Sequence, residues 1–355
     1  MNRWLGQFVR HLPPGAFAFV MATGIVSSAF ALIGWQVVSM VLLIVAIAGG
    51  VLLAVALLWR LIAFLPDALR DAQNPAVAFG YLTLVAAINV VGIRLFSPQA
   101  PGATIALALI SVPIWVIMVY GIPAVLMLRS RPTSAIADAD GSWFLWVVAT
   151  QSIATAAATI AQHERSEVLS AVAVALWGIG VMLYLMLATL VTLKLLTSAN
   201  SPHSLNPSYW IYMGATAITV FAGSRILVLP ADLPIMRVSE PVVSGLTFVL
   251  WAFGMWWIPL LVVFGVWRYL LGREPVRYES GFWSIVFPLG MFAVASMHFG
   301  RAAHLSTLVT IGEIGAVISG VAWLAALAAM VLAVLWKKPS ASAAAAAAGS
   351  AAGLR

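Results

Sequence analysis

The chain has 355 residues, of which 63% are hydrophobic and 8% are charged, and its mean hydropathy is +1.06. A composition this apolar excludes a soluble globular domain, and the absence of cysteine excludes disulfides and thiolate metal sites. The net charge of +7 comes from basic residues scattered over short loops, whereas nucleic-acid binding requires a clustered basic face, so we expect no nucleic-acid partner.

Ten apolar stretches follow one another along the chain, each long enough to cross the ~30 Å hydrocarbon core of a bilayer. They are too long and too continuous for the strands of a membrane barrel, so the sequence predicts an all-α polytopic membrane protein with one transport domain over residues 14–336. The predicted spans are residues 14–33, 38–61, 75–95, 102–128, 142–161, 167–196, 207–229, 239–268, 281–300 and 308–336. Residues 1–13 precede them, and residues 337–355 form an Ala/Ser-rich tail whose composition is typical of disorder.

The basic residues predict the orientation of these spans. With the N-terminus inside, 13 of the 18 Lys and Arg residues fall on the inner side and 5 on the outer side, whereas the acidic residues divide almost evenly. By the positive-inside rule, both termini are expected in the cytoplasm, with the protein crossing the inner (plasma) membrane many times.

Polar residues are concentrated in the odd-numbered spans, whereas the even-numbered ones are mostly Leu, Val, Ile, Ala and Trp. Because a polar side chain facing lipid is unfavourable, the odd spans should face protein or water. This alternation favours five hairpins, with the odd helices inside and the even helices outside, around a central pore. The candidate lining residues are Thr23, Ser27, Asn89, Gln151, Thr155, Thr219 and Ser284. In the alternative interpretation, these residues only mediate close helix packing.

Three arginines lie at or just after the outer ends of odd spans: Arg94, Arg225 and Arg301. A ring of guanidinium groups at the outer mouth would attract anions and bind carboxylates in a bidentate manner. The alternative is three interfacial arginines whose charged ends reach the water at the membrane surface.

Two titratable residues are candidates for proton coupling, Glu313 early in the tenth span and His298 late in the ninth. Glu313 could instead be an interfacial acid that pairs with Arg301 or His304, and His298 a hydrogen-bonded packing residue. The six-residue separation of His298 and His304 does not match the i, i+4 spacing of a helical metal pair, so we expect no metal site.

Phe287 and Pro288 in the middle of the ninth span are the sharpest local feature. Proline removes a backbone hydrogen bond and kinks a helix, and Gly290 loosens this helix further. A kink on an inner helix can push the phenylalanine ring into the axis, where an apolar constriction blocks hydrated ions. A packing kink with a core phenylalanine is the alternative.

Motifs of nucleotide-driven transport and of hydrolysis are missing from the sequence, which contains no GxxxxGK[ST], GxSxG or HExxH. We therefore expect neither an enzyme nor a cofactor. A membrane-embedded enzyme and a receptor without transport remain the alternative classes.

Two segments resemble a known family: LPPGAFAFVMATGIVSSAF in the first span and GFWSIVFPLGMFAVA in the ninth. They are similar to the tellurite-resistance/dicarboxylate transporter family. That family includes TehA-type proteins, yeast malate permeases, fungal sulfite exporters and plant slow anion channels, and the resemblance covers roughly residues 12–336.

The resemblance implies a homotrimer in which each protomer has its own pore, lined by the odd-numbered helices. It also implies that Phe287 occludes that pore, by the match of GFWSIVFP to the family motif. Val20 stands where the channel-like bacterial members have a proline, and MATGIVS is closer to the malate and sulfite branch. The expected function is transport of C4-dicarboxylates such as malate or succinate, or of sulfite or tellurite. The alternative is a gated anion channel for chloride or nitrate.

Overall fold

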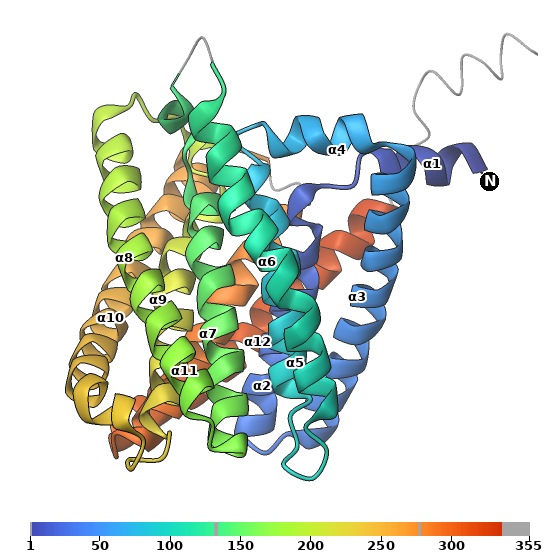
Figure 1. The fold of residues 1–355 in the computed structure, drawn as a ribbon. Coiled ribbons are helices and arrows are strands. Elements are labelled where there is room, and N and C mark those ends of the chain that lie inside the picture. Colours follow the sequence, from blue (N-terminus) through green and yellow to red (C-terminus); the bar gives the residue numbers. More distant parts are fainter. Residues whose placement is uncertain (1, 131–133, 276–277, 336–355) are drawn as a thin grey trace, which may run out of the picture.

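The computed structural model describes residues 2–130, 134–275 and 278–335 (Figure 1). Within these ranges the chain forms helices and turns without a β-strand, which confirms the predicted all-α membrane architecture. Nine helical segments in the described residues are long and apolar enough to cross a membrane. They are Pro14–Leu32, Gln36–Ala63, Gly102–Leu128, Gly141–Glu164, Glu167–Thr197, Pro207–Leu227, Pro234–Leu271, Ser280–Ala302 and Ser306–Leu335. The predicted tail, residues 337–355, lies outside the described residues.

The third predicted span, residues 75–95, forms the shorter apolar helix Ala78–Arg94. It begins with the 3₁₀ turn η2 (Ala78–Leu82) and continues as α5 (Thr83–Arg94). A 3₁₀ helix rises about 2.0 Å per residue and an α-helix about 1.5 Å, so this segment is about 28 Å long. It is therefore close to the thickness of the hydrocarbon core despite having fewer residues.

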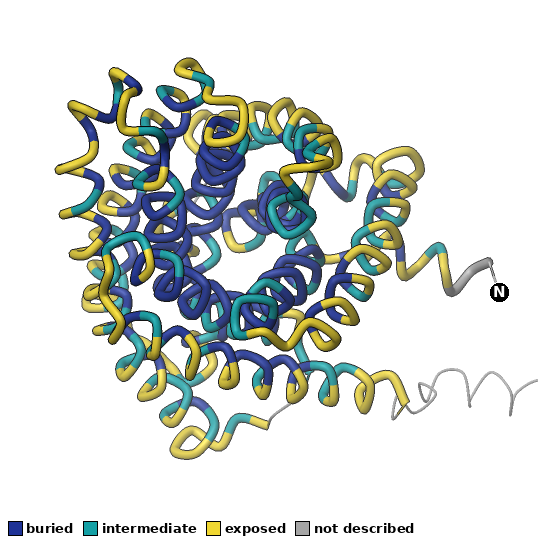
Figure 2. Tube along the Cα trace, turned by 90° about the horizontal axis from the view of Figure 1, so that it is seen from below, coloured by how far each residue is buried: buried dark blue, intermediate teal, exposed yellow. Residues whose placement is uncertain are grey.

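Five helices form a closed inner ring: α2 (Ala18–Leu32), α5, α7 (Leu145–Glu164), α9 (Trp210–Leu227) and α11 (Trp283–Ala302). Each packs against the next one in the chain, and α11 packs against α2 to complete the ring, seen end-on in Figure 2. The outer helices are α3 (Gln36–Ala63), α6 (Gly102–Leu128), α8 (Glu167–Thr197), α10 (Pro234–Val266) and α12 (Ser306–Leu335). Each outer helix packs on the inner helix that precedes it in the chain.

Burial alternates along the chain in the same way as the polar residues. The most apolar windows of the four long inner segments are 67–94% buried, whereas those of the outer helices are 17–44% buried. The outer helices are rich in Leu, Val and Ile, which lipid accommodates, and the inner ones in the small residues that allow close helix approach.

Each inner helix begins with a 3₁₀ turn: η1 (Pro14–Phe17), η2, η4 (Gly141–Phe144), η6 (Pro207–Tyr209) and η8 (Ser280–Phe282). Neighbouring turns contact one another and form a second closed ring, on the side of the bundle where the N-terminus lies (the N-terminal side). The contact is tight at Gly141, where a Cβ atom would lie 2.1 Å from the carbonyl oxygen of Ser208. This ring packs the N-terminal side of the axis with backbone and aromatic side chains, among them Phe79 and Phe144.

Two short helices, α1 (Asn2–Arg10) and α4 (Leu65–Ala72), lie across the N-terminal side of the bundle (Figure 1). Buried Arg60 at the end of α3 holds them in place, donating hydrogen bonds to the carbonyl oxygens of Arg10 and Leu12 and forming a 2.6 Å ion pair with Asp71. Its guanidinium group therefore crosslinks three segments instead of facing solvent.

The remaining short elements lie in connecting segments. They are the 3₁₀ turns η3 (Ala135–Asp138) and η5 (Pro202–Ser204) and the π-helical turn η7 (Trp267–Leu271) that extends α10.

Candidate anion pathway

A cavity of about 220 Å³ opens at the end of the inner ring opposite the N-terminal side; we call it the vestibule, and its side of the bundle the far side. All five inner helices reach this end at or near their C-termini. The vestibule is lined by Ser28, Ala31, Leu32, Ile93, Arg94, Phe96, Thr159, Phe221, Arg225, Val294 and His298. Three of the predicted functional residues, Arg94, Arg225 and His298, are thus brought together around one space.

The vestibule is positively charged. Arg225 Nη2 donates to Gln162 Oε1 at 2.8 Å, and Arg94 Nη2 donates to Ser39 Oγ at 2.8 Å. Among the described residues neither arginine forms an ion pair with a carboxylate, and the Nε atom of each is buried without a hydrogen-bond partner. Both guanidinium groups therefore keep their charge uncompensated by acidic side chains, and this favours an anion in the space they line.

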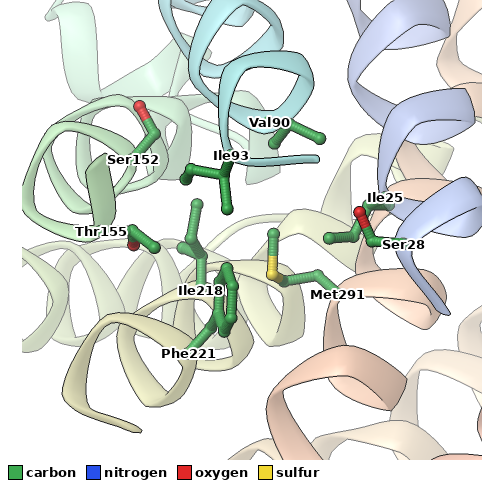
Figure 3. Close-up of a pocket in the computed structure, with 9 residues that line it drawn as sticks. All are labelled: Ile25, Ser28, Val90, Ile93, Ser152, Thr155, Ile218, Phe221 and Met291. Carbon is green, nitrogen blue, oxygen red and sulfur yellow. The ribbon is translucent and has the colours of Figure 1, made fainter. Parts of the chain in front are cut away.

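A second, smaller cavity of about 20 Å³ follows deeper along the axis. Four apolar side chains, Ile93, Ile218, Phe221 and Met291, converge on it from three inner helices (Figure 3). The other lining residues are Ile25, Ser28, Val90, Ser152 and Thr155. A space of this size holds about one water molecule, so a hydrated ion does not fit.

The hydroxyl groups around the smaller cavity are occupied by hydrogen bonds within their own helices. Ser152 Oγ donates to the carbonyl oxygen of Ala149, and Thr155 Oγ1 donates to that of Gln151, both at 2.7 Å. Ser28 Oγ donates to the carbonyl oxygen of Gly24 at 3.1 Å. Since each hydroxyl hydrogen already has an acceptor, this section of the axis offers an anion few free donors.

Phe287 lies one helical turn from Met291 on α11, toward the N-terminal side, and is 0% exposed. It is not among the residues that line either cavity. The next residue, Pro288, is packed against α9, where a Cβ atom on Gly214 would lie 2.8 Å from its Cγ. Gly290 brings α11 close to α2, since a Cβ there would lie 2.9 Å from Ile25 Cγ2.

Of the predicted lining residues, only Thr155 is among those that line the two cavities. The others are buried elsewhere in the bundle. Thr23 Oγ1 accepts a hydrogen bond from Trp323 of α12, Ser27 bonds to Ser39 of α3, and Gln151 donates to the carbonyl oxygen of Trp177 in α8. Their polar groups therefore join inner helices to outer ones.

Thr219 and Ser284 are buried as well. Thr219 donates to the carbonyl oxygen of Ala215 within α9, and its own carbonyl oxygen accepts a hydrogen bond from Trp177 of α8. Ser284 lies in the first turn of α11, on the N-terminal side.

Asn89 occupies a buried position between three helices. Its Nδ2 donates to Ser152 Oγ at 3.2 Å and to the carbonyl oxygen of Val85 at 3.0 Å, while its Oδ1 accepts from Ser111 at 3.1 Å. Asn89 therefore contacts the pathway indirectly, through Ser152.

Two charged candidates lie apart from the vestibule. Arg301 is exposed and donates to the carbonyl oxygen of Leu32, which puts it at the rim. Glu313 is exposed on α12, an outer helix, and makes no ion pair among the described residues. Among the residues that the structure describes, there is no group of three or more His, Asp and Glu residues that could hold a metal ion.

The apolar lining residues were not predicted from the sequence, although a signal for them exists. Ile218, Phe221 and Arg225 are spaced three and four residues apart on α9, and Met291, Val294 and His298 repeat that spacing on α11. The residues one and two helical turns before each charged vestibule residue lie on the same face of the helix, so this spacing predicts that they line the same axis.

Comparison with known proteins agrees with this architecture. A family model described as "Voltage-dependent anion channel" matches residues 11–331. "Uncharacterized membrane protein Rv1735c" of Mycobacterium tuberculosis is 47% identical over 131 residues, which are 37% of this chain and 66% of that protein. "Uncharacterized transporter MJ0762" of Methanocaldococcus jannaschii is 27% identical over 122 residues, 34% of either chain.

The chain thus spans just under two thirds of the length of the mycobacterial protein and about one third of the archaeal one. The resemblance to tellurite-resistance/dicarboxylate transporters and slow anion channels is confirmed by the family match, which extends over nearly the whole sequence. The chain belongs to the voltage-dependent anion channel family.

Proposed function

We propose that this protein moves small anions across the membrane along the axis of the inner helix ring, with C4-dicarboxylates or oxyanions such as sulfite and tellurite as substrates. One observation supports this most strongly: a vestibule with two uncompensated guanidinium groups leads into the centre of a closed helix ring. An anion drawn there by Arg94 and Arg225 meets no acidic side chain among those lining the two cavities.

The gate in this proposal is Phe287, and Pro288 and Gly290 permit its movement. Phe287 continues the face of α11 formed by Met291, Val294 and His298, since a separation of four residues is about one helical turn. Its ring would close the axis on the N-terminal side of the smaller cavity. By the distribution of Lys and Arg, that side would face the cytoplasm, with the vestibule outside and both termini inside.

The second candidate function is a gated channel for chloride or nitrate. It is favoured by the description of the matching family model as a voltage-dependent anion channel. The lining of the smaller cavity also favours it, because hydroxyls without free hydrogens suit weak, passing contacts better than tight binding. In either case, we propose that three protomers assemble, each with its own pathway.

Anion flux into proteoliposomes tests the proposal, with wild type and Phe287→Ala compared for chloride, nitrate, sulfite, malate and succinate. A large rise for many anions in the variant is expected from an occluded channel with Phe287 as its gate. Saturable malate flux in wild type that falls in the variant supports a carrier. The matched control is Phe292→Ala, a buried ring on the same helix that stacks on Trp251 of α10, 5.9 Å between centroids.

Coupling to protons is tested in the same vesicles with membrane voltage clamped. Flux that follows an imposed pH gradient supports a coupling role for His298 or Glu313. Flux that is insensitive to the gradient contradicts it. No flux of any anion in wild type or in Phe287→Ala would contradict the proposed function.

A further inference from the structure

The vestibule and the smaller cavity meet at three residues that line both, Ser28 of α2, Ile93 of α5 and Phe221 of α9. Thr159 and His298 line only the vestibule, whereas Thr155 and Met291 line only the smaller cavity. Thr155 and Thr159 are one helical turn apart on α7, so the boundary between the two spaces falls within a single turn of the ring.

Phe221 supplies the largest side chain at this boundary. It is 5% exposed, and Figure 3 shows its ring beside Ile218 and Met291 at the smaller cavity. The ring packs on the imidazole of His298 from α11, with centroids 5.0 Å apart and an interplanar angle of 51°. It lies one helical turn before Arg225 on the same face of α9.

The axis therefore narrows before it reaches the level of Phe287. The cavity volume falls from about 220 Å³ in the vestibule to about 20 Å³ beyond the ring of Phe221. An anion held by Arg225 has the Phe221 ring one turn deeper on the same helix. Such an apolar constriction resists the passage of hydrated ions.

We propose that Phe221 is an outer gate, separate from the gate at Phe287, and that His298 is the positioning residue that holds its ring across the axis. The anion would have to displace the Phe221 ring to leave the vestibule, and only then meet Phe287. This inference rests on the proposed function, since it assumes that the axis is the pathway.

Cysteine accessibility distinguishes the two gates, because the chain contains no cysteine of its own. Single cysteines are placed in the vestibule (Ala31→Cys), where Ala31 is partly exposed, and beyond the boundary (Thr155→Cys), where Thr155 is buried. A negatively charged methanethiosulfonate is added from the far side. Ala31→Cys should react quickly and Thr155→Cys slowly. Since access follows the population of open states, adding Phe221→Ala should speed the reaction at Thr155→Cys at least about tenfold.

Phe287→Ala should leave the rate at Thr155→Cys unchanged, because Phe287 lies on the other side of the smaller cavity. Phe221→Leu keeps an apolar side chain and should give an intermediate rate, as should His298→Ala, which frees the ring without removing it. The matched control is Phe292→Ala, a buried ring on the side of α11 that faces α10.

Two results would overturn the outer gate. One is a reaction at Thr155→Cys as fast as at Ala31→Cys in the chain with Phe221 intact. The other is a reaction rate at Thr155→Cys that is raised by neither Phe221→Ala nor Phe221→Leu, when both variants elute from a size-exclusion column as the wild type does. If anion flux persists in either case, only this inference fails. If Ala31→Cys is itself unreactive, the vestibule and the proposed function fail with it.

Discussion

Asn89 connects three helices through one buried side chain, with hydrogen bonds to Ser152 of α7 and Ser111 of α6 and to the backbone of its own helix. Inside a membrane, water is not available to satisfy an amide, so these partners fix its position and that of Ser152. Gln151 and Ser27 are fixed in the same way, because each forms a hydrogen bond to an outer helix.

Replacing Asn89 should destabilise the helix bundle and leave the positive charge of the vestibule unchanged. We expect Asn89→Leu to lower the free energy of unfolding by about 1 kcal/mol, since interhelical hydrogen bonds in membranes contribute about 0.6 kcal/mol on average and up to about 1.7 kcal/mol. Thermal melting in detergent measures the effect. Ser111→Ala is the control with a smaller loss, because the one hydroxyl hydrogen of Ser111 is shared between Asn89 Oδ1 and the carbonyl oxygen of Ala108, whereas Asn89 takes part in three hydrogen bonds. Equal melting temperatures of Asn89→Leu and wild type would contradict the stabilising role of the Asn89 hydrogen bonds.

Asp67 of α4 offers a prediction about pH. Arg10 lies 2.7 Å from one carboxylate oxygen and Arg70 lies 2.9 Å from the other, and the hydrogen bond and charge of Arg10 hold the pKa of Asp67 below its ordinary value of 3.8. The unfolded chain thus takes up a proton at higher pH than the folded one. The stabilisation is therefore present above that ordinary value and is lost as the pH falls through the folded pKa.

We accordingly expect Asp67→Asn to melt at a lower temperature than wild type at neutral pH, with the difference disappearing in strongly acidic buffer. Thermal melting across a pH series measures it. Asp138→Asn is the matched control, since Asp138 is exposed and has no ion pair in the part of the chain that the structure describes. A difference that stays constant down to low pH would contradict the ion-pair account.

At the scale of elements, the ring of 3₁₀ turns closes the N-terminal side of the bundle. A 3₁₀ turn is narrower than an α-helical turn, so five of them fit around the axis where five α-helical ends would be crowded. The fit depends on missing side chains, as at Gly141 against Ser208 and at Gly80, where a Cβ would lie 2.8 Å from the Gly15 nitrogen.

Gly141→Ala should therefore prevent normal closure of this ring. The added methyl group would meet backbone atoms of η6, which cannot move aside as a flexible side chain can. We expect a large loss of folded protein, measured as the monodisperse fraction in size-exclusion chromatography after extraction. Gly178→Ala on α8 is the control, because nothing lies within 4 Å of its Cβ position. Similar yields for the two variants would refute the packing argument.

The spans were predictable from the sequence because a bilayer imposes a length on apolar segments, and Gly102–Leu128 begins and ends at the predicted residues. The 3₁₀ turns were not predictable, since no periodicity marks a single turn. Arg94 and Arg225 line one cavity because each lies at or near the end of an inner helix. The sequence alone does not separate hydroxyls that line a pore from hydroxyls that join helices, because Ser and Thr in membranes bond to their own backbone or to neighbouring helices as readily as they line a pore.

At the scale of the whole molecule, the charge is distributed unevenly along the axis. Arg94 and Arg225 stand on the far side, while the middle is apolar and the N-terminal side is packed with turns. A concentration of positive potential at one mouth raises the local concentration of anions, and salt weakens the effect.

Removing one vestibule charge should therefore slow anion flux in a salt-dependent way. We expect Arg225→Gln to lower flux several-fold at low ionic strength and less at high ionic strength, measured in proteoliposomes carrying Phe287→Ala. Arg165→Gln is the matched control, since Arg165 lies on the same side but pairs with Asp232 at 2.9 Å in an exposed position. Equal flux for Arg225→Gln and Arg165→Gln at every salt concentration would exclude a role for the vestibule charge.

The central claim is that anions pass along the axis of the inner ring, and blocking that axis tests it most directly. The measurement is anion flux through Phe287→Ala carrying Ala31→Cys in the vestibule, before and after reaction with a bulky methanethiosulfonate. Gln99→Cys, in the exposed far-side loop, is the matched control. We predict that modification abolishes flux through the Ala31→Cys protein and leaves the Gln99→Cys protein unaffected. Undiminished flux through fully modified Ala31→Cys would contradict the account, because the anions would then cross by another route.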